Sequence, residues 1–166
     1  MGAIDTSKGS SVDAAFLAPF VSGVVEVLTM QIDIKVEKQK PFVKTSDFQP
    51  DIGIIGMITL DCPQFKGVVA VCFPQDVFLK LYEAILGESH SELNAEVQDG
   101  AAEILNMVYG QAKTVLKQKG YELGKAIPSV VLGGTAPVEA IEGRSVIVVP
   151  FKIDFGTFHL EFIMQD

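Results

Sequence analysis

The stretch 96–117 carries an apolar residue at every third or fourth position. This spacing matches the turn of an α-helix, and the stretch is too long for a strand, so we predict one long amphipathic helix. Asn94 is the expected N-cap, and Gly120 is expected to end the helix. Because such a helix must bury its apolar face against a second layer, it constrains the fold more than any other segment. The residues expected on the buried face are Val97, Ala101, Ile104, Leu105, Val108, Ala112, Val115 and Leu116.

A second series with helical spacing falls on the opposite side of the same stretch: Asp99, Glu103, Asn106 and Gly110, followed by Lys113 and Lys117. Asn is a poor helix former, and Gly inside a helix costs about 1 kcal/mol relative to Ala. An exposed face with an acid, an amide and a missing side chain is typical of a surface that another molecule approaches. Two alternatives stay open. Asp99 could simply be a favourable charge near the helix N-terminus, and Gly110 could mark close packing of two helices.

The remaining segments follow from periodicity and turn residues. We predict a helix at 12–30 capped by Ser11, a strand at 32–38, a loop at 40–51, strands at 52–60 and 67–73, a helix at 77–86 capped by Asp76 and ended by Gly87, and strands at 129–132, 145–153 and 157–164. Pro150 suggests an edge or a bulge in its strand. Since strands and helices do not alternate, the predicted class is α+β, with a mostly antiparallel six-stranded sheet packed by helices.

The predicted order also repeats, because a helix followed by three strands occurs twice. The two helices can be aligned so that Ser22, Glu26 and Thr29 fall on Asp99, Glu103 and Asn106. A Gly follows the first polar residue in both copies. The repeat predicts an internal duplication of a helix-plus-three-strand unit.

Length and composition favour a single folded domain. The chain has 166 residues, 48% of them hydrophobic, which is enough for one core. We expect a flexible lead at 1–11 and one domain at 12–166. The net charge of −8 argues against binding to nucleic acid or to an anionic membrane. No apolar run approaches the ~20 residues of a membrane span, and the N-terminus lacks the pattern of a signal peptide.

The two cysteines and two histidines form no recognisable site in the sequence. Cys62 and Cys72 lack Cys-x-x-Cys spacing, and neither has a His nearby in the chain. His90 and His159 are isolated, so a metal site would have to rely on carboxylates alone, and none cluster in the sequence. We therefore predict no metal in this chain. Two reduced thiols are typical of a cytoplasmic protein.

The helix stripe resembles the motif of the CheC/CheX chemotaxis phosphatase family, and its CheX-like members in particular. That motif is an acid or Ser, then three residues, Glu, two residues, Asn, and a Pro about twenty residues later. Here it is Asp99, Glu103, Asn106 and Pro128. The segments 103–113, 16–20, 149–151 and 156–158 are also similar, so the resemblance covers about residues 12–164. CheC-type members carry the motif in both helices, whereas Thr29 breaks the first copy here, which matches the CheX pattern of one site per chain.

The resemblance implies a CheC-like fold and hydrolysis of the aspartyl phosphate of a CheY-type receiver domain, in chemotaxis or related two-component signalling. Asn106 would position the attacking water, and Glu103 would pair with the active-site Lys of the receiver. Asp99 and Gly110 are further candidates for partner contacts, and Ser22, Glu26 and Thr29 form a degenerate second motif that we interpret as a structural remnant. Mg²⁺ would belong to the receiver, with no cofactor in this chain. The family also implies a homodimer formed through the sheets.

Two other functions are compatible with this resemblance. One is a non-catalytic binding module that docks on a receiver without hydrolysing it. The other is a structural domain like those of the flagellar switch, against which the intact Glu103 and Asn106 argue.

Overall fold

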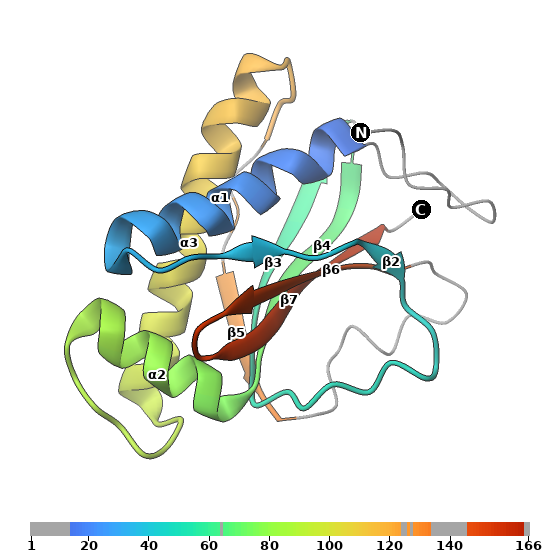
Figure 1. The fold of residues 1–166 in the computed structure, drawn as a ribbon. Helices are drawn as coiled ribbons and strands as arrows, with labels where there is room; N and C mark the ends of the chain where they lie inside the picture. The colour runs from blue at the N-terminus through green and yellow to red at the C-terminus, as the bar shows by residue number, and fades with distance from the viewer. Residues whose placement is uncertain (1–13, 64, 124–125, 127, 134–145, 165–166) are drawn as a thin grey trace.

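The protein is described by a computed structural model at residues 14–63, 65–123, 126, 128–133 and 146–164. Its three helices lie on one side of a single antiparallel sheet (Figure 1). In chain order the elements are α1 (Ala14–Ile32), β1 (Glu37–Lys38), β2 (Phe42–Val43), β3 (Ile54–Cys62), β4 (Phe65–Phe73), α2 (Gln75–Leu86), α3 (Ala95–Gln118), β5 (Pro128–Leu132), β6 (Val146–Ile153) and β7 (Gly156–Met164). The α+β class is confirmed. Ser11 and the lead at 1–11 lie outside the described residues.

The strand order reveals the predicted duplication. Across the sheet the strands run β1-β6-β7-β4-β3-β5, and β2 also pairs with β6. If β1, β3 and β4 are the strands of the first copy and β5, β6 and β7 those of the second, the order reads the same from either edge. Each copy contributes one central hairpin, β3–β4 or β6–β7. The remaining strand of each copy pairs with the hairpin of the other copy, β1 with β6 and β5 with β3. β4 and β7 meet in the middle, where the two copies join.

The sheet has seven strands rather than the predicted six, because the first strand of copy one is replaced by two short pieces. The prediction of a strand over 32–38 was wrong at its start. α1 continues to Ile32, and Asp33 then adopts a left-handed backbone with φ 50°. Only Glu37–Lys38 pairs with β6. The alternating pattern of this segment remains visible, since Ile34 and Val36 are half-buried against the core.

Pro150 accounts for the break between the two short strands. β1 pairs with β6 on one side of Pro150, and β2 pairs with β6 on the other side. β2 lies within the segment 40–51, which was predicted as a loop. Between them the Gln39 backbone N–H donates to the Pro150 carbonyl over 2.8 Å. A proline has no N–H to return, so a continuous ladder cannot form there. The prediction of an edge or a bulge at Pro150 was wrong, because β6 is an inner strand and its pairing with β7 runs through Pro150 without a break. The interruption is in the neighbouring strand instead, between β1 and β2.

The ends of α2 match the prediction at one end only. Gly87 caps its C-terminus at φ 81°, and its N–H donates to the carbonyl of Glu83. The N-cap is Pro74, however, and no side chain caps this end, so the prediction of Asp76 as the cap was wrong. Asp76 lies instead in the first turn, where its negative charge still complements the helix dipole.

The main core lies between the helices and one face of the sheet. α1 contributes six buried side chains to it: Phe16, Leu17, Phe20, Val24, Val27 and Leu28. The expectation that no apolar run approaches a membrane span was wrong for Ala15–Ile32, which by length and composition alone would qualify as one. Because its apolar face packs on α3 and the sheet, the helix also fits the description of a core helix, which passes the same test.

α1 and α3 cross each other (Figure 1). They are in close contact at Gly23, which is buried. A Cβ atom placed on Gly23 would lie 2.9 Å from the backbone carbonyl oxygen of Val108 in α3. Backbone cannot move aside as a side chain can, so this approach requires glycine. The contact fixes how far α3 stands from α1 and so positions the outward face of α3.

Gly23→Ala is expected to destabilise the protein by about 1–3 kcal/mol, because overpacking at a helix crossing outweighs the better helix propensity of Ala. The measurement is urea unfolding followed by circular dichroism. The matched control is Ser22→Ala, one residue earlier and exposed, which should leave stability within about 0.5 kcal/mol. Equal stability of the two variants would contradict the close crossing.

Candidate functional site

The long helix predicted from the sequence is α3, and its N-cap is Asn94 as expected. The Asn94 side chain accepts a hydrogen bond of 2.9 Å from the Val97 backbone N–H. The residues buried on α3 are Val97, Gly100, Ala101, Ile104, Leu105, Val108, Tyr109, Ala112 and Leu116. Val115 was predicted in this set but is 37% exposed, whereas Ala112 and Leu116 in the same turns are fully buried. The helix ends at Gln118, and Gly120 follows with φ 91°.

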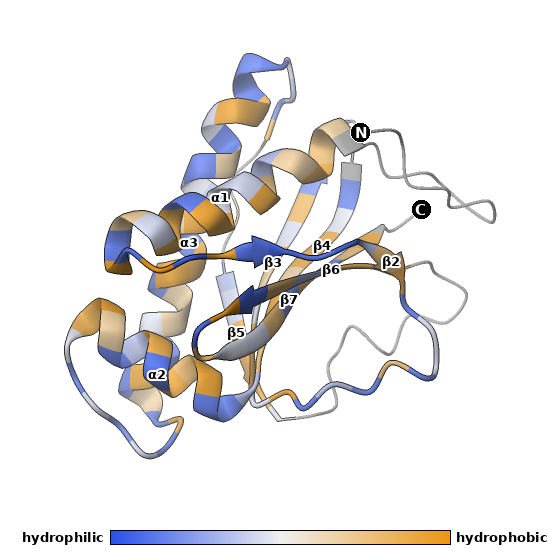
Figure 2. Ribbon diagram, viewed as in Figure 1, coloured by the Kyte–Doolittle hydropathy of each residue, from blue (hydrophilic) through white to orange (hydrophobic). Residues whose placement is uncertain are grey.

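Asp99, Glu103, Asn106 and Gly110 are all exposed on the outward face of α3. We call these four residues the α3 stripe. The alternation of hydrophilic and hydrophobic segments along α1 and α3 is visible in Figure 2. Glu103 and Asn106 are three residues apart, so their side chains leave the helix about one turn apart on the same side. The arrangement leaves both side chains accessible to another protein.

Gly110 is not at a helix contact. A Cβ atom built on it would meet nothing within 4 Å. The alternative of close helix packing is therefore wrong for Gly110, while it holds for Gly23 in α1. On α3 the glycine that packs closely is Gly100, where a Cβ would overlap the ring of the buried Tyr82. Gly110 leaves the helix surface beside Asn106 without a side chain. Gly lowers the stability of the helix here, and no packing contact with a described residue explains its presence.

The side chains of Glu103 and Asn106 have no hydrogen bond or ion pair with any described residue. Their surroundings are acidic. Burial raises the pKa of Tyr82, and the negative charges of four nearby carboxylates raise it further, in the order Glu96, Glu88, Glu103 and Asp99. The α3 stripe therefore begins in a region of negative potential, which favours a cationic group on a partner.

The copy of the motif on α1 has the same setting. Ser22, Glu26 and Thr29 are all exposed, as their counterparts are. The two helices pack against each other, and the symmetric strand order relates the two copies. What differs is chemistry, because Thr29 offers a hydroxyl on a short branched side chain where α3 offers the longer carboxamide of Asn106. Pro128, the last motif residue, begins β5 opposite Ile58, which fits a role in starting the strand.

The structure corrects the expectation about metal-binding residues. Cys72, His159 and Glu161 come together although they lie far apart in the sequence, and their ligand atoms all lie within 4.8 Å of one another. The statement that a metal site would have to rely on carboxylates was therefore wrong, because strand pairing places a thiol, an imidazole and a carboxylate side by side. This cluster lies on the sheet face opposite to α3.

A second group, Glu88, His90 and Glu96, lies at the N-terminal end of α3. His90 Nε2 is 3.5 Å from a Glu88 oxygen and 3.8 Å from a Glu96 oxygen. The hydrogen bond and charge of Glu88 raise the pKa of Glu96. Both glutamates are exposed, so this group is a weak candidate for holding an ion.

Comparisons with known proteins show the same family as the resemblance in the sequence. The sequence profile of the family "Chemotaxis phosphatase CheX" matches residues 54–152, which is more than half of the chain. The chemotaxis protein CheX from Vibrio vulnificus is similar in structure, with a TM-score of 0.81, 30% identity, and coverage of 92% of this chain and 100% of the other.

Two further structures are similar. A chemotactic CheC-like protein from Shewanella oneidensis MR-1 has a TM-score of 0.80 at 32% identity, covering 91% and 98% of the two chains. The CheX–CheY–BeF₃–Mg²⁺ complex from Borrelia burgdorferi has a TM-score of 0.73 at 18% identity, covering 91% and 98%, and this likeness concerns the fold alone. No curated protein sequence matches the chain.

Two glycine substitutions on α3 should have opposite effects on stability. Gly110→Ala is expected to stabilise the protein by up to about 1 kcal/mol, since the site is open and Ala favours the helix. Gly100→Ala, its matched control on the same helix, should destabilise by about 1–3 kcal/mol because the new methyl group overlaps Tyr82. Thermal and urea unfolding measure both. A destabilised Gly110→Ala would show that this position is packed.

Proposed function

Because the chain belongs to the CheX family of chemotaxis phosphatases, we propose that it hydrolyses the aspartyl phosphate of a CheY-type receiver domain. The observation that carries this proposal is the pair Glu103 and Asn106, one helical turn apart on an exposed face and without partners among the described residues. A solvated helix face would not need Asn and Gly at the two positions where they weaken the helix. If another protein covers this face, both the Asn and the Gly are explained by contacts with that protein.

The reaction requires little more than positioning. Water attacks phosphorus in line with the bond to the aspartate oxygen, that bond breaks, and the receiver's carboxylate leaves, while the water protons stay on the released phosphate or pass to solvent. Phosphoryl transfer of this kind proceeds through a loose transition state, so no strong base is needed. A carboxamide both donates and accepts hydrogen bonds and stays neutral at all working pH values. Asn106 therefore suits the task of holding the water in line.

Glu103 serves as the docking residue in this proposal. Its carboxylate is exposed in an acidic region, and an ion pair with the receiver's active-site Lys would fix the register between the two proteins. Asp99 adds negative charge one turn earlier, and Gly110 lets the partner approach the backbone of α3. A relative from Borrelia burgdorferi with the same fold is known in a complex with CheY, BeF₃ and Mg²⁺. That complex supports a CheY-type partner here.

The remaining assignments complete the proposal. Mg²⁺ is assigned to the receiver, where it offsets phosphoryl charge, so the α3 stripe needs no metal of its own. We assign the protein to the cytoplasm, where receiver domains act. Family resemblance also supports a homodimer formed through the sheets.

The alternative function is docking without hydrolysis. Exposure of Glu103 would serve both functions, because it concerns recognition. The presence of Asn106 favours the phosphatase. Asn weakens a helix, and a module that only binds has no need of an amide that positions water. Measuring binding and phosphate release on the same receiver distinguishes the two functions, because a binding module would bind without accelerating phosphate release.

Asn106→Ala should lower accelerated phosphate release by about 100-fold or more, because the attacking water loses its positioning group. Binding to a BeF₃-treated receiver should change little, and the fold should be retained because the side chain is exposed. The assay measures phosphate release from a panel of phosphorylated receivers. Thr29→Ala is the matched control at the equivalent position of α1, and it should keep parental activity. Parental activity in Asn106→Ala would remove the catalytic assignment.

Glu103→Lys should weaken docking by at least about tenfold, because it places like charge against the receiver's Lys. Affinity is measured by titration calorimetry with the same BeF₃-treated receiver at two salt concentrations. Glu26→Lys makes the same charge change at the equivalent position of α1 and should bind like the parent. Equal weakening in both variants would point to net charge rather than to a specific ion pair.

A further inference from the structure

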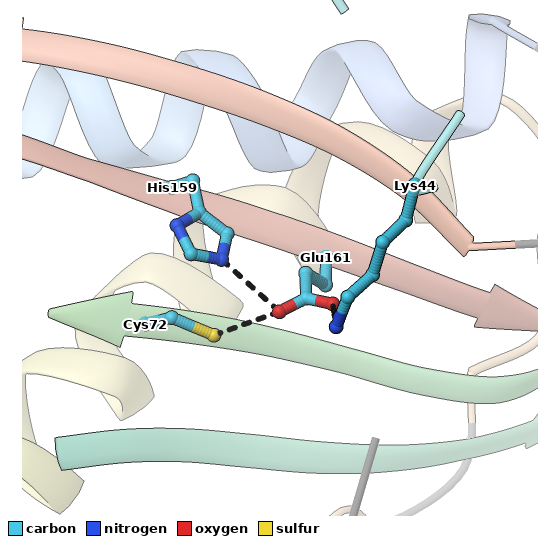
Figure 3. Close-up of polar contacts among 4 residues, drawn as sticks. All are labelled: Lys44, Cys72, His159 and Glu161. Carbon is cyan, nitrogen blue, oxygen red and sulfur yellow. Dashed lines mark hydrogen bonds and ion pairs between the residues drawn. The ribbon is translucent and has the colours of Figure 1, made fainter. Parts of the chain in front are cut away.

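Four polar side chains meet on the sheet face that is turned away from the helices (Figure 3). Cys72 in β4 and His159 in β7 are directly paired across the central strand junction. Glu161 is two residues further along β7, so its side chain leaves the sheet on the same face as His159. Lys44, just after β2, reaches the group from the side. We call these four residues the central cluster.

The contacts in the central cluster converge on one carboxylate. Glu161 Oε2 lies 3.3 Å from Cys72 Sγ and 3.0 Å from His159 Nε2. Its other oxygen, Oε1, accepts a hydrogen bond of 2.9 Å from Lys44 Nζ. Cys72 and Glu161 are fully buried, and His159 is 5% exposed. Figure 3 shows the thiol and the imidazole approaching the same oxygen from two sides, while the ammonium group is on the other oxygen.

An apolar shell surrounds these contacts. Ile55, Ala70 and Ile163 are buried on the same sheet face. The ring of Phe48 packs edge-on against His159, with centroids 5.2 Å apart. Charged groups in such surroundings persist only when they are paired or coordinated. The electrostatic field around the central cluster is therefore strong and poorly screened.

The protonation states follow from these contacts. Burial would raise the pKa of the Glu161 carboxyl, but the hydrogen bonds and charges of His159 and Lys44 lower it to about 2. Glu161 is thus an anion near neutral pH. Burial, aided by the charge of Glu161, raises the pKa of the Cys72 thiol. A protonated thiol that faces a carboxylate is a poor nucleophile, so the central cluster is not built for thiol catalysis.

We propose that Cys72, His159 and Glu161 form a zinc site at the centre of the sheet, with three protein ligands and one open position. Thiolate, imidazole and carboxylate are the three ligand types that zinc takes in proteins. Tetrahedral bonds of about 2.0–2.3 Å place neighbouring ligand atoms about 3.2–3.8 Å apart. The separations of 3.0 and 3.3 Å to Glu161 Oε2 need to widen by only a few tenths of an ångström. The third separation, between the Cys72 and His159 ligand atoms, is within 4.8 Å. A water molecule would complete the four ligands.

Charge and protons balance in this arrangement. On binding, the Cys72 thiol releases its proton to solvent, and so does the Nε2–H of His159 that faces Glu161 in the metal-free cluster. The ring then keeps one proton, on Nδ1, and Nε2 is free to coordinate. Zn²⁺ is then neutralised by the thiolate and the carboxylate. Lys44 keeps its bond to Glu161 Oε1 and orients that carboxylate, which is the usual task of a partner behind a metal ligand. The ion would tie β4, β7 and the segment after β2 together.

The test uses the full chain, unfolded with a chelator and refolded with or without one equivalent of Zn²⁺ or Co²⁺. We expect about one bound metal per chain and a rise in Tm of about 5 °C or more at saturating Zn²⁺. The Co²⁺ form should show thiolate-to-cobalt charge-transfer absorption. This band identifies a cysteine ligand, so the exposed group Glu88, His90 and Glu96 cannot produce it. A refolded protein without the band and without a Zn²⁺-dependent Tm would overturn the proposal.

Variants separate the ligands from bystanders. Cys72→Ser and His159→Gln should lose the band or the metal, and Cys62→Ser is the matched control, a second buried cysteine that faces the helices and should keep both. His90→Gln should also keep both. Metal retained in Cys72→Ser but lost in His90→Gln would assign the binding to the exposed group and reject the site proposed here.

Lys44→Met keeps all three proposed ligands, so it tests the site even if the ligand variants fail to fold. A cluster that works only through hydrogen bonds predicts that this variant is destabilised and that Zn²⁺ does not help it. A zinc site predicts that Zn²⁺ stabilises the variant at least as much as the parent, because a neighbouring positive charge has been removed. Thermal unfolding with and without Zn²⁺ measures the difference, and a Tm that does not respond to Zn²⁺ counts against the proposal.

Discussion

The pairing of β4 with β7 is the contact on which the rest of the structure depends. It joins the two helix-plus-three-strand copies at the middle of the sheet, and each copy then completes itself with a strand of the other. Because the two hairpins are held in this way, α1 and α3 reach the same face of the sheet and cross at Gly23. The outward direction of α3 is thus decided by a strand pairing far from it in the sequence.

The duplication places similar helices in similar settings, yet only one of them carries the full set of chemical groups. Both stripes are exposed, so exposure alone does not distinguish them. The difference lies in the carboxamide of Asn106 against the hydroxyl of Thr29, and in Gly110, whose place in a helix no packing explains. Residues kept at a cost to stability are a sign of function, because selection for folding alone would replace them.

Three errors of the sequence-based prediction have separate physical causes. The segment 32–38 alternates like a strand, but its period says nothing about whether a partner strand is available along its full length. Glu37 pairs with Lys152, and β6 ends one residue later at Ile153, so the residues before Glu37 have no strand to pair with in the described part of the chain. Val115 has helical spacing, but at this end of α3 only the side that carries Ala112 and Leu116 is covered. The prediction of Asp76 as the N-cap was wrong because Pro74 has the extended backbone of the N-cap, and α2 begins directly after it.

The sequence by itself determined the long helix, the stripe of Asp99, Glu103, Asn106 and Gly110, the repeat and the α+β class. These features depend on period and spacing within one segment, which local geometry converts directly into faces of a helix. Only the tertiary structure decided that Gly110 is open while Gly23 is packed, and that Cys72 lies beside His159 and Glu161. Contacts of that kind join residues almost ninety positions apart, and they arise from strand register, which no local pattern specifies.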